Sequence, residues 1–382
     1  MRDESYRLLM IIGRYHPDIG GTEKACRIIS KKLQETGFAV TVLTSHREGL
    51  PAYELIDGVP VYRYMKGWHL YEITYMLSVL SFLIRNRLRF DGIFCFGLYL
   101  FTAPAVLFAR LTGKRVFFRL CGARETGDFY RLSLLTCKQI ILWFARKAHG
   151  AIALSTELEQ ELQDNDFPER KIFRLPNAVD TCTFNPARKK AGDPFTICYI
   201  GRLAKGKGLE TLIRALAVVK KQTTAFNVLI VGEGTLRNQL EAQVEKLGLS
   251  EHVCFTGQVD NVQDYYHQSH LFVLPSSSEG MPHAMLEAMA CGLAVVATPV
   301  GGIRDIMQLP RDILIKESSG YRICSSAVLV QPGNETALAE SIMLLFRDRE
   351  LCSNLGKNAR SSINSSYALE KVIADYARLF SR

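Results

Sequence analysis

The stretch Tyr199–Gly208, YIGRLAKGKG, joins a strand-like apolar run to a helical pattern. Gly201–Lys207 fits the GxxxxGK spacing of a loop that surrounds phosphate oxygens at the start of a helix. A P-loop nucleoside triphosphatase needs Ser or Thr as the next residue, to hold Mg²⁺, and residue 208 is Gly. The stretch therefore excludes that class and predicts a phosphate-binding turn with the cations Arg202, Lys205 and Lys207. An exposed basic turn without a ligand is the alternative.

The alternation of apolar runs and helical patterns extends in both directions from this stretch. Strands that are apolar throughout and separated by helices are typical of a parallel sheet covered on both faces. We therefore predict an α/β chain with two doubly wound sheets. The predicted strands are Arg7–Ile12, Val40–Thr44, Ile93–Phe96, Val116–Arg119, Ala151–Leu154, Phe195–Ile200, Asn227–Val231, Val253–Phe255, Leu271–Leu274 and Ala294–Ala297.

A polar stretch at 188–194 interrupts the alternation and is the expected linker between two domains. We place the first domain at 1–187, the second at 188–364, and a C-terminal helix at 365–382. Residues 308–327 resemble an irregular insertion with no assigned role. The uncharged run Gly92–Ala109 has the minimum length of a membrane span. Its internal Gly, Thr and Pro favour a buried strand, turn and helix instead.

Composition narrows the class of protein. The chain has 382 residues, of which 48% are hydrophobic and 22% charged, which excludes disordered and fibrous proteins. Residues 1–190 contain 28 basic and 19 acidic side chains, whereas the remainder is neutral. This one-sided excess predicts an anionic partner for the first half, either a membrane surface or a phosphorylated acceptor. A solvated basic surface is the alternative.

The ten cysteines form no CxxC pair, and several lie in apolar runs, which is typical of a reducing compartment. The charged start MRDESYR does not resemble a signal peptide. We therefore expect a cytoplasmic protein, peripheral on the inner face of the membrane if it binds lipid. His267 and His270 form an HxxH pair without an evident third ligand, so no metal site is predicted.

In doubly wound sheets, ligands bind beyond the carboxyl ends of the strands, so the loops there are the candidate sites. The first such loop contains His16 and ends in Gly20-Gly21 before a helix. A later loop, Gly232-Glu-Gly234, begins like a dinucleotide-binding motif, but Arg237 occupies the position of its third glycine. A dinucleotide site is therefore not expected.

A third loop and helix, 275–291, contain two glutamates eight residues apart. Glu279 precedes the helix, and Glu287 lies within it, one turn after His283. A carboxylate in so apolar a helix needs a partner, and the hydroxyl groups of a sugar or ribose would supply one. A glycosidase pair, or a helix cap with a salt bridge, are the alternatives.

The motifs GG, GRLxKGKG, GEG, FTG, Ex₇E and CGxxVVAT occur in this order from about residue 8 to the C-terminus. The chain thereby resembles the retaining GT-B glycosyltransferases of family 4. The resemblance implies two Rossmann-like domains facing a central cleft, with the acceptor in the first and a nucleotide sugar in the second. It also implies a last helix that crosses back to the first domain.

The resemblance assigns roles to individual residues. Arg202 and Lys207 would hold the donor diphosphate, helped by Gly201 and Lys205. Glu279 would bind the hydroxyls of the donor sugar, and Glu287 the ribose diol. The remaining donor contacts would be Gly20, Gly21, Gly280, Met281, Pro282 and His283.

Two positions differ from the family pattern. Cys121 replaces the histidine that commonly faces the reacting sugar, so the backbone or Arg124 would make that contact instead. Cys121 itself, and His16 in the first loop, are further candidates for contact with sugar or acceptor. Asp305 replaces a glutamate in the last motif.

The expected reaction is transfer of a sugar from a nucleotide diphosphate sugar to an acceptor hydroxyl, with retention of configuration and without a metal. A UDP-sugar is the expected co-substrate, no cofactor is expected, and nucleic acid is not an expected partner. The acceptor would be lipid-linked or a saccharide, in cell-surface polysaccharide or glycolipid synthesis. The alternatives are a nucleotide-sugar 2-epimerase and a non-catalytic GT-B subunit that supports an active partner. Mixed cationic and apolar clusters at 85–90 and 129–147 favour contact between the first domain and an anionic membrane.

Overall fold

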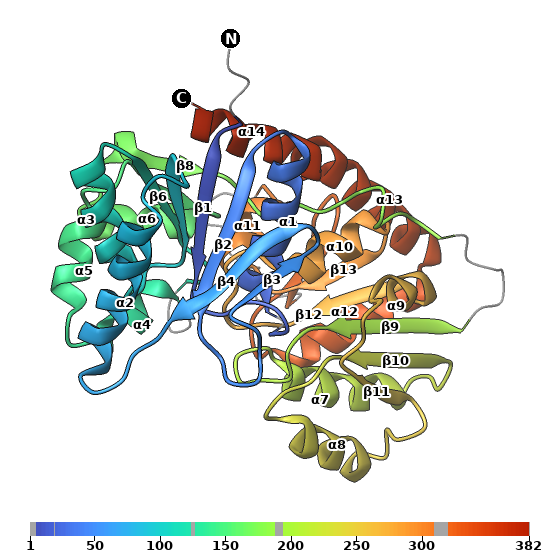
Figure 1. Cartoon of the computed structure of the whole chain (residues 1–382). Helices are drawn as coiled ribbons and strands as arrows, with labels where there is room; N and C mark the ends of the chain where they lie inside the picture. Colours follow the sequence, from blue (N-terminus) through green and yellow to red (C-terminus); the bar gives the residue numbers. More distant parts are fainter. Residues whose placement is uncertain (1–4, 19, 124–126, 188–193, 309–319, 382) are drawn as a thin grey trace. The chain divides into compact units, whose positions relative to one another are not determined.

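The computed structural model describes residues 5–381 apart from 19, 124–126, 188–193 and 309–319. The chain divides into two compact units, one made of Met1–Asn177 with Lys371–Arg382 and the other of Ala178–Glu370. The expected boundary at 187/188 therefore lies inside the second unit. Both units are α/β with largely parallel sheets, which confirms the predicted fold class (Figure 1).

The first unit is built on an eight-stranded sheet of order β3-β4-β2-β1-β5-β6-β7-β8. The order reverses at β1 and β5, which are parallel neighbours with Leu8 opposite Gly92. Its strands are β1 (Arg7–Ile12), β2 (Ala39–Ser45), β3 (Tyr53–Ile56), β4 (Val59–Met65), β5 (Gly92–Phe96), β6 (Arg115–Arg119), β7 (Gly150–Ala153) and β8 (Ile172–Arg174). Its helices are α1 (Gly21–Glu35), α2 (Tyr71–Arg85), α3 (Thr102–Thr112), α4 (Asp128–Ser133), α5 (Lys138–Ala145) and α6 (Thr156–Asp164), with a 3₁₀ turn at Glu169–Lys171.

The hairpin of β3 and β4 was not predicted from the sequence. Strand β4 alternates buried and half-buried residues, as expected for a strand near the sheet edge, and β3 pairs with it antiparallel. The run Gly92–Ala109 forms β5, a turn and most of α3, as predicted. Within the described residues, no helix is long and apolar enough to cross a membrane.

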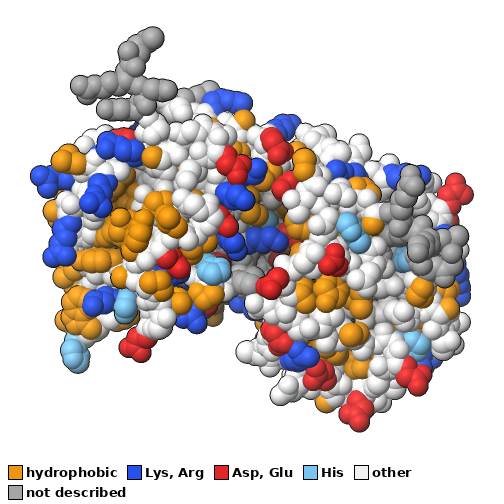
Figure 2. Space-filling model, turned by 45° about the vertical axis from the view of Figure 1, so that its right-hand side comes forward, with side chains coloured by type: hydrophobic (Ala, Val, Ile, Leu, Met, Phe, Trp, Pro, Cys, Tyr) orange, Lys and Arg blue, Asp and Glu red, His pale blue; other side chains and the backbone are white. Residues whose placement is uncertain are grey.

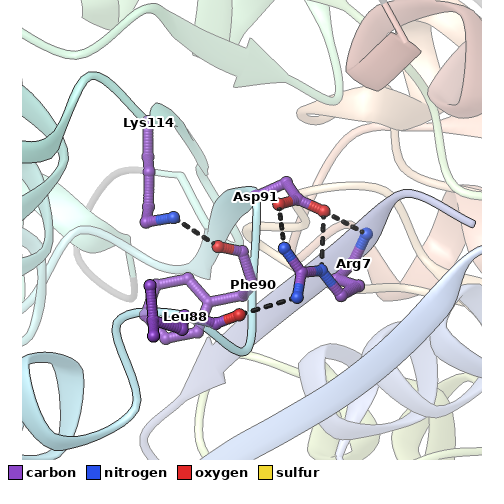
Figure 3. A network of polar contacts seen from close by, with 5 residues as sticks. All are labelled: Arg7, Leu88, Phe90, Asp91 and Lys114. Carbon is purple, nitrogen blue, oxygen red and sulfur yellow. Dashed lines mark hydrogen bonds and ion pairs between the residues drawn. The ribbon is translucent and has the colours of Figure 1, made fainter. Parts of the chain in front are cut away.

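A polar network fastens the amino ends of the strands in the first unit (Figure 3). The Arg7 guanidinium donates to both carboxylate oxygens of Asp91, at 3.0 and 2.6 Å, and to the Leu88 carbonyl at 2.6 Å. Lys114 donates to the Phe90 carbonyl at 2.6 Å. The Arg7 bonds lower the pKa of Asp91. The network joins β1 to the segments that precede β5 and β6.

Helix α14 (Leu369–Ser381) belongs to the first unit from Lys371 onward. Tyr376 and Phe380 are buried there, with ring centroids 5.8 and 5.1 Å from that of Phe94. The buried guanidinium of Arg119 donates to the hydroxyl of Tyr376 at 3.5 Å and to the side-chain oxygen of Asn177. The C-terminal segment is therefore part of the first unit's core.

The second unit contains a seven-stranded sheet of order β11-β10-β9-β12-β13-β15-β14. All its pairs are parallel except that of β14 with β15. Its strands are β9 (Phe195–Ile200), β10 (Phe226–Val231), β11 (Val253–Gly257), β12 (Leu271–Leu274), β13 (Ala294–Ala297), β14 (Tyr321–Ile323) and β15 (Val328–Val330). Its helices are α7 (Leu209–Lys220), α8 (Arg237–Lys246), α9 (Gln263–Gln268), α10 (His283–Ala290), α11 (Gly302–Ile306), α12 (Glu335–Arg347) and α13 (Arg349–Ser366).

Polar side chains define where the long helices of this unit begin. Asn334 accepts a hydrogen bond from the Ala337 amide at the start of α12, and Asp348 accepts one from Leu351 at the start of α13. The expected insertion at 308–327 contains β14, and its residues 309–319 lie outside the described part of the chain.

Candidate functional site

The site in the second unit lies where the strand order reverses. Strands β9 and β12 are neighbours, although the chain continues from β9 to β10 on one side and from β12 to β13 on the other. Their carboxyl ends lead into the loops 201–208 and 275–282, which carry the predicted phosphate and sugar contacts. A reversal point of this kind is where open α/β sheets bind ligands.

The loops at this edge pack backbone against backbone. Gly208 has φ +72°, and a Cβ there would lie 2.0 Å from the Pro275 carbonyl oxygen. A Cβ at Gly232 would lie 2.0 Å from the Gly201 carbonyl oxygen. The Ser277 amide donates to the Gly206 carbonyl at 2.9 Å. The GEG motif, which does not match a dinucleotide-binding motif, thus packs against the predicted phosphate-binding turn.

Lys207 and Glu279 meet at this edge. The Lys207 ammonium lies 2.7 Å from Glu279 Oε1, and the Ser276 hydroxyl donates to the same oxygen at 2.7 Å. The Glu279 side chain is 9% exposed and that of Lys207 is 26% exposed, so water screens this ion pair only partly. Both bonds that described residues make to this carboxylate end on Oε1. Glu279 Oε2 is therefore available to a ligand hydroxyl.

Arg202 and Lys205 are exposed on the same turn. The backbone carbonyl of Arg202 accepts a hydrogen bond of 3.1 Å from the hydroxyl of buried Tyr199, which fixes the turn from below. Neither cationic head group bonds to any residue that the structure describes. The turn thus presents two uncompensated cations beside the Lys207–Glu279 pair.

Three further predicted donor contacts are buried just before α10 and within it. Met281, His283 and Glu287 are nearly inaccessible to solvent. The Tyr266 hydroxyl lies 3.2 Å from Glu287 Oε2 and 3.0 Å from the Ala284 carbonyl. Burial, and then the adjacent Glu287, raises the pKa of Tyr266 well above its ordinary value. Tyr266 and Ser276 contact the candidate residues Glu287 and Glu279, and sequence reasoning missed both because neither lies in a recognised motif.

The candidate residues of the first unit follow its own reversal point. Gly20 caps α1 in an extended conformation, with its carbonyl 2.9 Å from the Lys24 amide, and Gly21 begins that helix. The His16 carbonyl accepts a hydrogen bond of 2.6 Å from the buried guanidinium of Arg63. Arg124 lies outside the described residues.

Cys121 follows β6 and is held by a carboxylate that the sequence analysis did not single out. Buried Asp128 accepts hydrogen bonds from the amides of Cys121 at 2.6 Å, Gly122 at 3.1 Å and Leu98 at 2.9 Å. It therefore ties the loop after β6 to the loop after β5. Burial, with a contribution from Asp128, raises the pKa of the Cys121 thiol to about 12. A thiolate nucleophile at this position is disfavoured at neutral pH.

The two histidines of the HxxH pair each contact backbone. A ring nitrogen of His267 lies 2.8 Å from the Asn185 carbonyl oxygen, and His270 accepts a hydrogen bond of 3.2 Å from the Thr196 amide. Both contacts fasten segments of the second unit to each other. They give these side chains a structural role without a metal ion.

Two family models match consecutive parts of the chain. Glycosyltransferase Family 4 matches residues 19–182, and Glycosyl transferases group 1 matches residues 183–362. The boundary between the two matches falls close to the boundary between the two units.

Individual proteins are also similar to this chain. The chain is 28% identical to a phosphatidylinositol N-acetylglucosaminyltransferase subunit of Arabidopsis thaliana, over 81% of this chain and 70% of that one. It is 24% identical to N-acetyl-alpha-D-glucosaminyl L-malate synthase of Bacillus anthracis, over 96% of this chain and 94% of that protein. The structure of Anabaena HepE in complex with UDP-glucose has a TM-score of 0.76 and 17% identity, and covers 98% of this chain and 99% of its own.

The matching family models, the parallel sheets with their order reversals and the interlocked glycine loops agree. The chain belongs to the GT-B glycosyltransferases of family 4.

Proposed function

We propose that the protein transfers a sugar from a UDP-sugar to an acceptor hydroxyl with retention of configuration. The observation that carries this proposal is the arrangement of Arg202, Lys207 and Glu279 at the reversal point of the second sheet. Support for the donor class comes from the UDP-glucose complex of HepE, which shares the fold.

The cations would act on the departing diphosphate. As the glycosidic bond to the nucleotide breaks, negative charge grows on the bridging phosphate oxygen. Arg202 and Lys207, preorganised on the turn before α7, would stabilise this charge in place of a metal ion. Backbone amides at the start of α7 would add further donors.

Glu279 would orient the transferred sugar. Its Oε1 is occupied by Lys207 and Ser276, which hold the carboxylate in one position. Its Oε2 would accept hydrogen bonds from sugar hydroxyls, with Gly280, Met281, Pro282 and His283 nearby on the chain. Glu287 would bind the ribose diol, with Tyr266 supporting it from the opposite side. Retention would follow from attack of the acceptor on the face from which the diphosphate leaves.

The acceptor would be lipid-linked, in cell-surface polysaccharide or glycolipid synthesis at the cytoplasmic face of a membrane. When charges are counted over the two structural units, the first unit has 28 basic and 19 acidic residues. The second unit has 19 of each. Charge complementarity therefore favours an anionic acceptor or surface for the first unit.

The full chain tests the donor proposal directly. Thermal melts with UDP, GDP and ADP should show stabilisation by UDP, because a ligand that binds only the folded state shifts unfolding. Slow hydrolysis of a UDP-hexose without acceptor should follow. Stabilisation by UDP without hydrolysis or transfer would favour a non-catalytic subunit. Interconversion of two UDP-sugars would favour an epimerase.

A further inference from the structure

The first unit has an exposed apolar surface that nothing in the described chain covers. Among described residues, fifteen large hydrophobic side chains are exposed, and all but Ile323 lie in the first unit. Figure 2 shows hydrophobic side chains gathered with lysines and arginines over the left-hand part of the view. A concentration of this kind marks an interaction surface, because soluble proteins rarely leave large apolar patches exposed.

Helix α2 and the segment before it make up much of this surface. Tyr75, Val79 and Phe82 on one face are buried against the unit. Ile73 and Leu77, one turn apart on another face, are 52% and 55% exposed. In the segment before the helix, Trp68 is 55% exposed and Leu70 is 76% exposed. Helix α2 is therefore apolar on a face that the unit does not use.

Helix α5 extends this surface and is fastened to α2. Ile140 and Trp143 are each 54% exposed. The Glu72 carboxylate of α2 accepts hydrogen bonds from the amides of Thr136 at 3.0 Å and Cys137 at 2.9 Å, just before α5. These bonds hold the start of α2 next to the start of α5. We call Trp68, Leu70, Ile73, Leu77, Ile140 and Trp143 the α2–α5 face.

Four cations near the two ends of α2 make no ion pair with any described residue. Arg85 donates to the Tyr64 hydroxyl at 3.0 Å, and Arg89 contacts the Tyr62 hydroxyl at 3.5 Å. Lys66 and Arg87 are exposed and make no ion pair with described residues. Cations combined with exposed apolar side chains match the chemistry of an anionic lipid surface.

A cavity of about 480 Å³ lies between β4 and α2 beside this face. His46 follows β2 and Lys66 follows β4, so both lie at the carboxyl edge of the sheet, where ligands bind. Trp68 and Leu77 complete its apolar side, and no Asp or Glu among the described residues lines it. Arg63, which also lines it, is paired with Glu54 and with the His16 carbonyl. Lys66 and His46 are therefore the groups that would meet a ligand.

We propose that this cavity binds the phosphate of an anionic phospholipid while the α2–α5 face inserts into the membrane interface. The cavity would thereby receive the headgroup of a lipid-linked acceptor. The assignment of the bound lipid as the acceptor rests on the proposed transferase function. Binding of the lipid does not depend on catalysis. Hydroxyl groups keep the cavity in shape, since Ser78 accepts from the Lys66 amide at 3.1 Å and Thr74 from the Trp68 amide at 3.0 Å.

The two tryptophans of the chain, Trp68 and Trp143, both lie on the face and report binding by their fluorescence. The full chain would be titrated with vesicles of phosphatidylcholine alone and of phosphatidylcholine with phosphatidylglycerol. We expect a blue shift with the anionic vesicles only, weakened but not abolished by salt. The blue shift should persist in both Trp143→Phe and Trp68→Phe, because each variant retains one tryptophan on the face.

Lys66→Gln should weaken partition onto the anionic vesicles roughly fivefold, as expected for one cation near the surface. The double variant Ile73→Ser with Leu77→Ser should remove the part of vesicle binding that persists at high salt. The matched control Lys246→Gln, an exposed lysine on α8 of the second unit, should bind vesicles normally.

Dihexanoyl phosphatidylglycerol and glycerol phosphate separate a lipid ligand from a free phosphate. The proposal expects binding of the first and little binding of the second. Equal binding of both, or no blue shift with anionic vesicles at low salt, would overturn it. UDP-dependent stabilisation, measured on the same samples, shows independently whether the proposed donor function stands.

Discussion

The Lys207 ammonium lies 2.7 Å from Glu279 Oε1, across 72 residues of sequence. This contact joins the predicted phosphate-binding turn after β9 to the loop after β12. A charge pair that is largely shielded from water holds both side chains in fixed positions. The proposed phosphate and sugar contacts are consequently set before any donor binds.

Removal of either phosphate cation should slow the reaction. We expect Arg202→Ala and Lys207→Ala each to lower turnover by about 10²–10³, since one preorganised contact to a developing anion contributes on the order of 3–4 kcal/mol. Single-turnover transfer from the preferred UDP-sugar measures this. Lys246→Gln is the charge control. Near-native turnover in both folded variants would contradict the diphosphate assignment.

Lys207→Ala should also affect the glutamate. It leaves Glu279 with Ser276 as its remaining described partner, so we expect weaker discrimination between donor sugars. In Arg202→Ala the Lys207–Glu279 pair is intact, and discrimination should be preserved. Comparing kcat/KM for two UDP-hexoses in both variants tests the difference.

The two glutamates should have separable roles. Glu279→Gln should lower kcat more than it weakens UDP binding, because its free oxygen is proposed to face the sugar. Glu287→Gln should weaken UDP binding, because the buried carboxylate is proposed to hold the ribose. Calorimetric titration with UDP, alongside kinetics, distinguishes them, and an equal loss of affinity in both would refute the division. Tyr266→Phe should reproduce part of the Glu287→Gln effect.

Gly208→Ala should destabilise the second unit through a backbone clash. The left-handed φ costs a residue with a Cβ about 1–2 kcal/mol, and the Cβ would also meet the Pro275 carbonyl at 2.0 Å. Gly333 has a similar φ, +79°, with no atom within 4 Å of a Cβ. Gly333→Ala should therefore show only the conformational cost. Urea unfolding measures both variants. An equal loss of unfolding free energy in Gly208→Ala and Gly333→Ala would exclude the clash.

The Arg7–Asp91 pair should make the first unit sensitive to acid. Arg7 lowers the pKa of Asp91 in the folded protein. The ion pair therefore stabilises the fold fully above the pKa of Asp91 in the unfolded chain, about 4. This stabilisation is lost as the pH falls through the pKa of Asp91 in the folded protein. Both side chains are more than a third exposed, so we expect only about 0.5–1 kcal/mol. Asp91→Asn should remove this dependence. Thermal melts from neutral pH to pH 3 would contradict the prediction if variant and parent lost stability in parallel.

The sequence by itself determined the class of fold and predicted which loops would form the donor site. Apolar strand runs such as Phe195–Ile200, each followed by a helical pattern, permit little other than parallel sheets covered by helices. The glycines and cations of Tyr199–Gly208 lie close together in the chain, so their motif can be recognised without knowledge of the fold. The alternation also identified Gly92–Ala109 as a buried strand and helix.

Other features were decided only by the tertiary structure. The partners of Glu279 and Glu287, and the three amides that meet at Asp128, come from separate loops whose proximity depends on strand order. The end of α14 joins a core far from it in sequence. The β3–β4 hairpin, by contrast, has a local signal that the sequence analysis did not use, the two-residue turn Asp57-Gly58 with φ +51° and +80°. The cluster at 129–147 was recognised in the sequence, but the exposure of Ile140 and Trp143, and of Trp68, Leu70, Ile73 and Leu77 at and before α2, was decided by the fold. An apolar residue in a helix packs inward or faces solvent according to which neighbours cover it, and only the folded chain determines those neighbours.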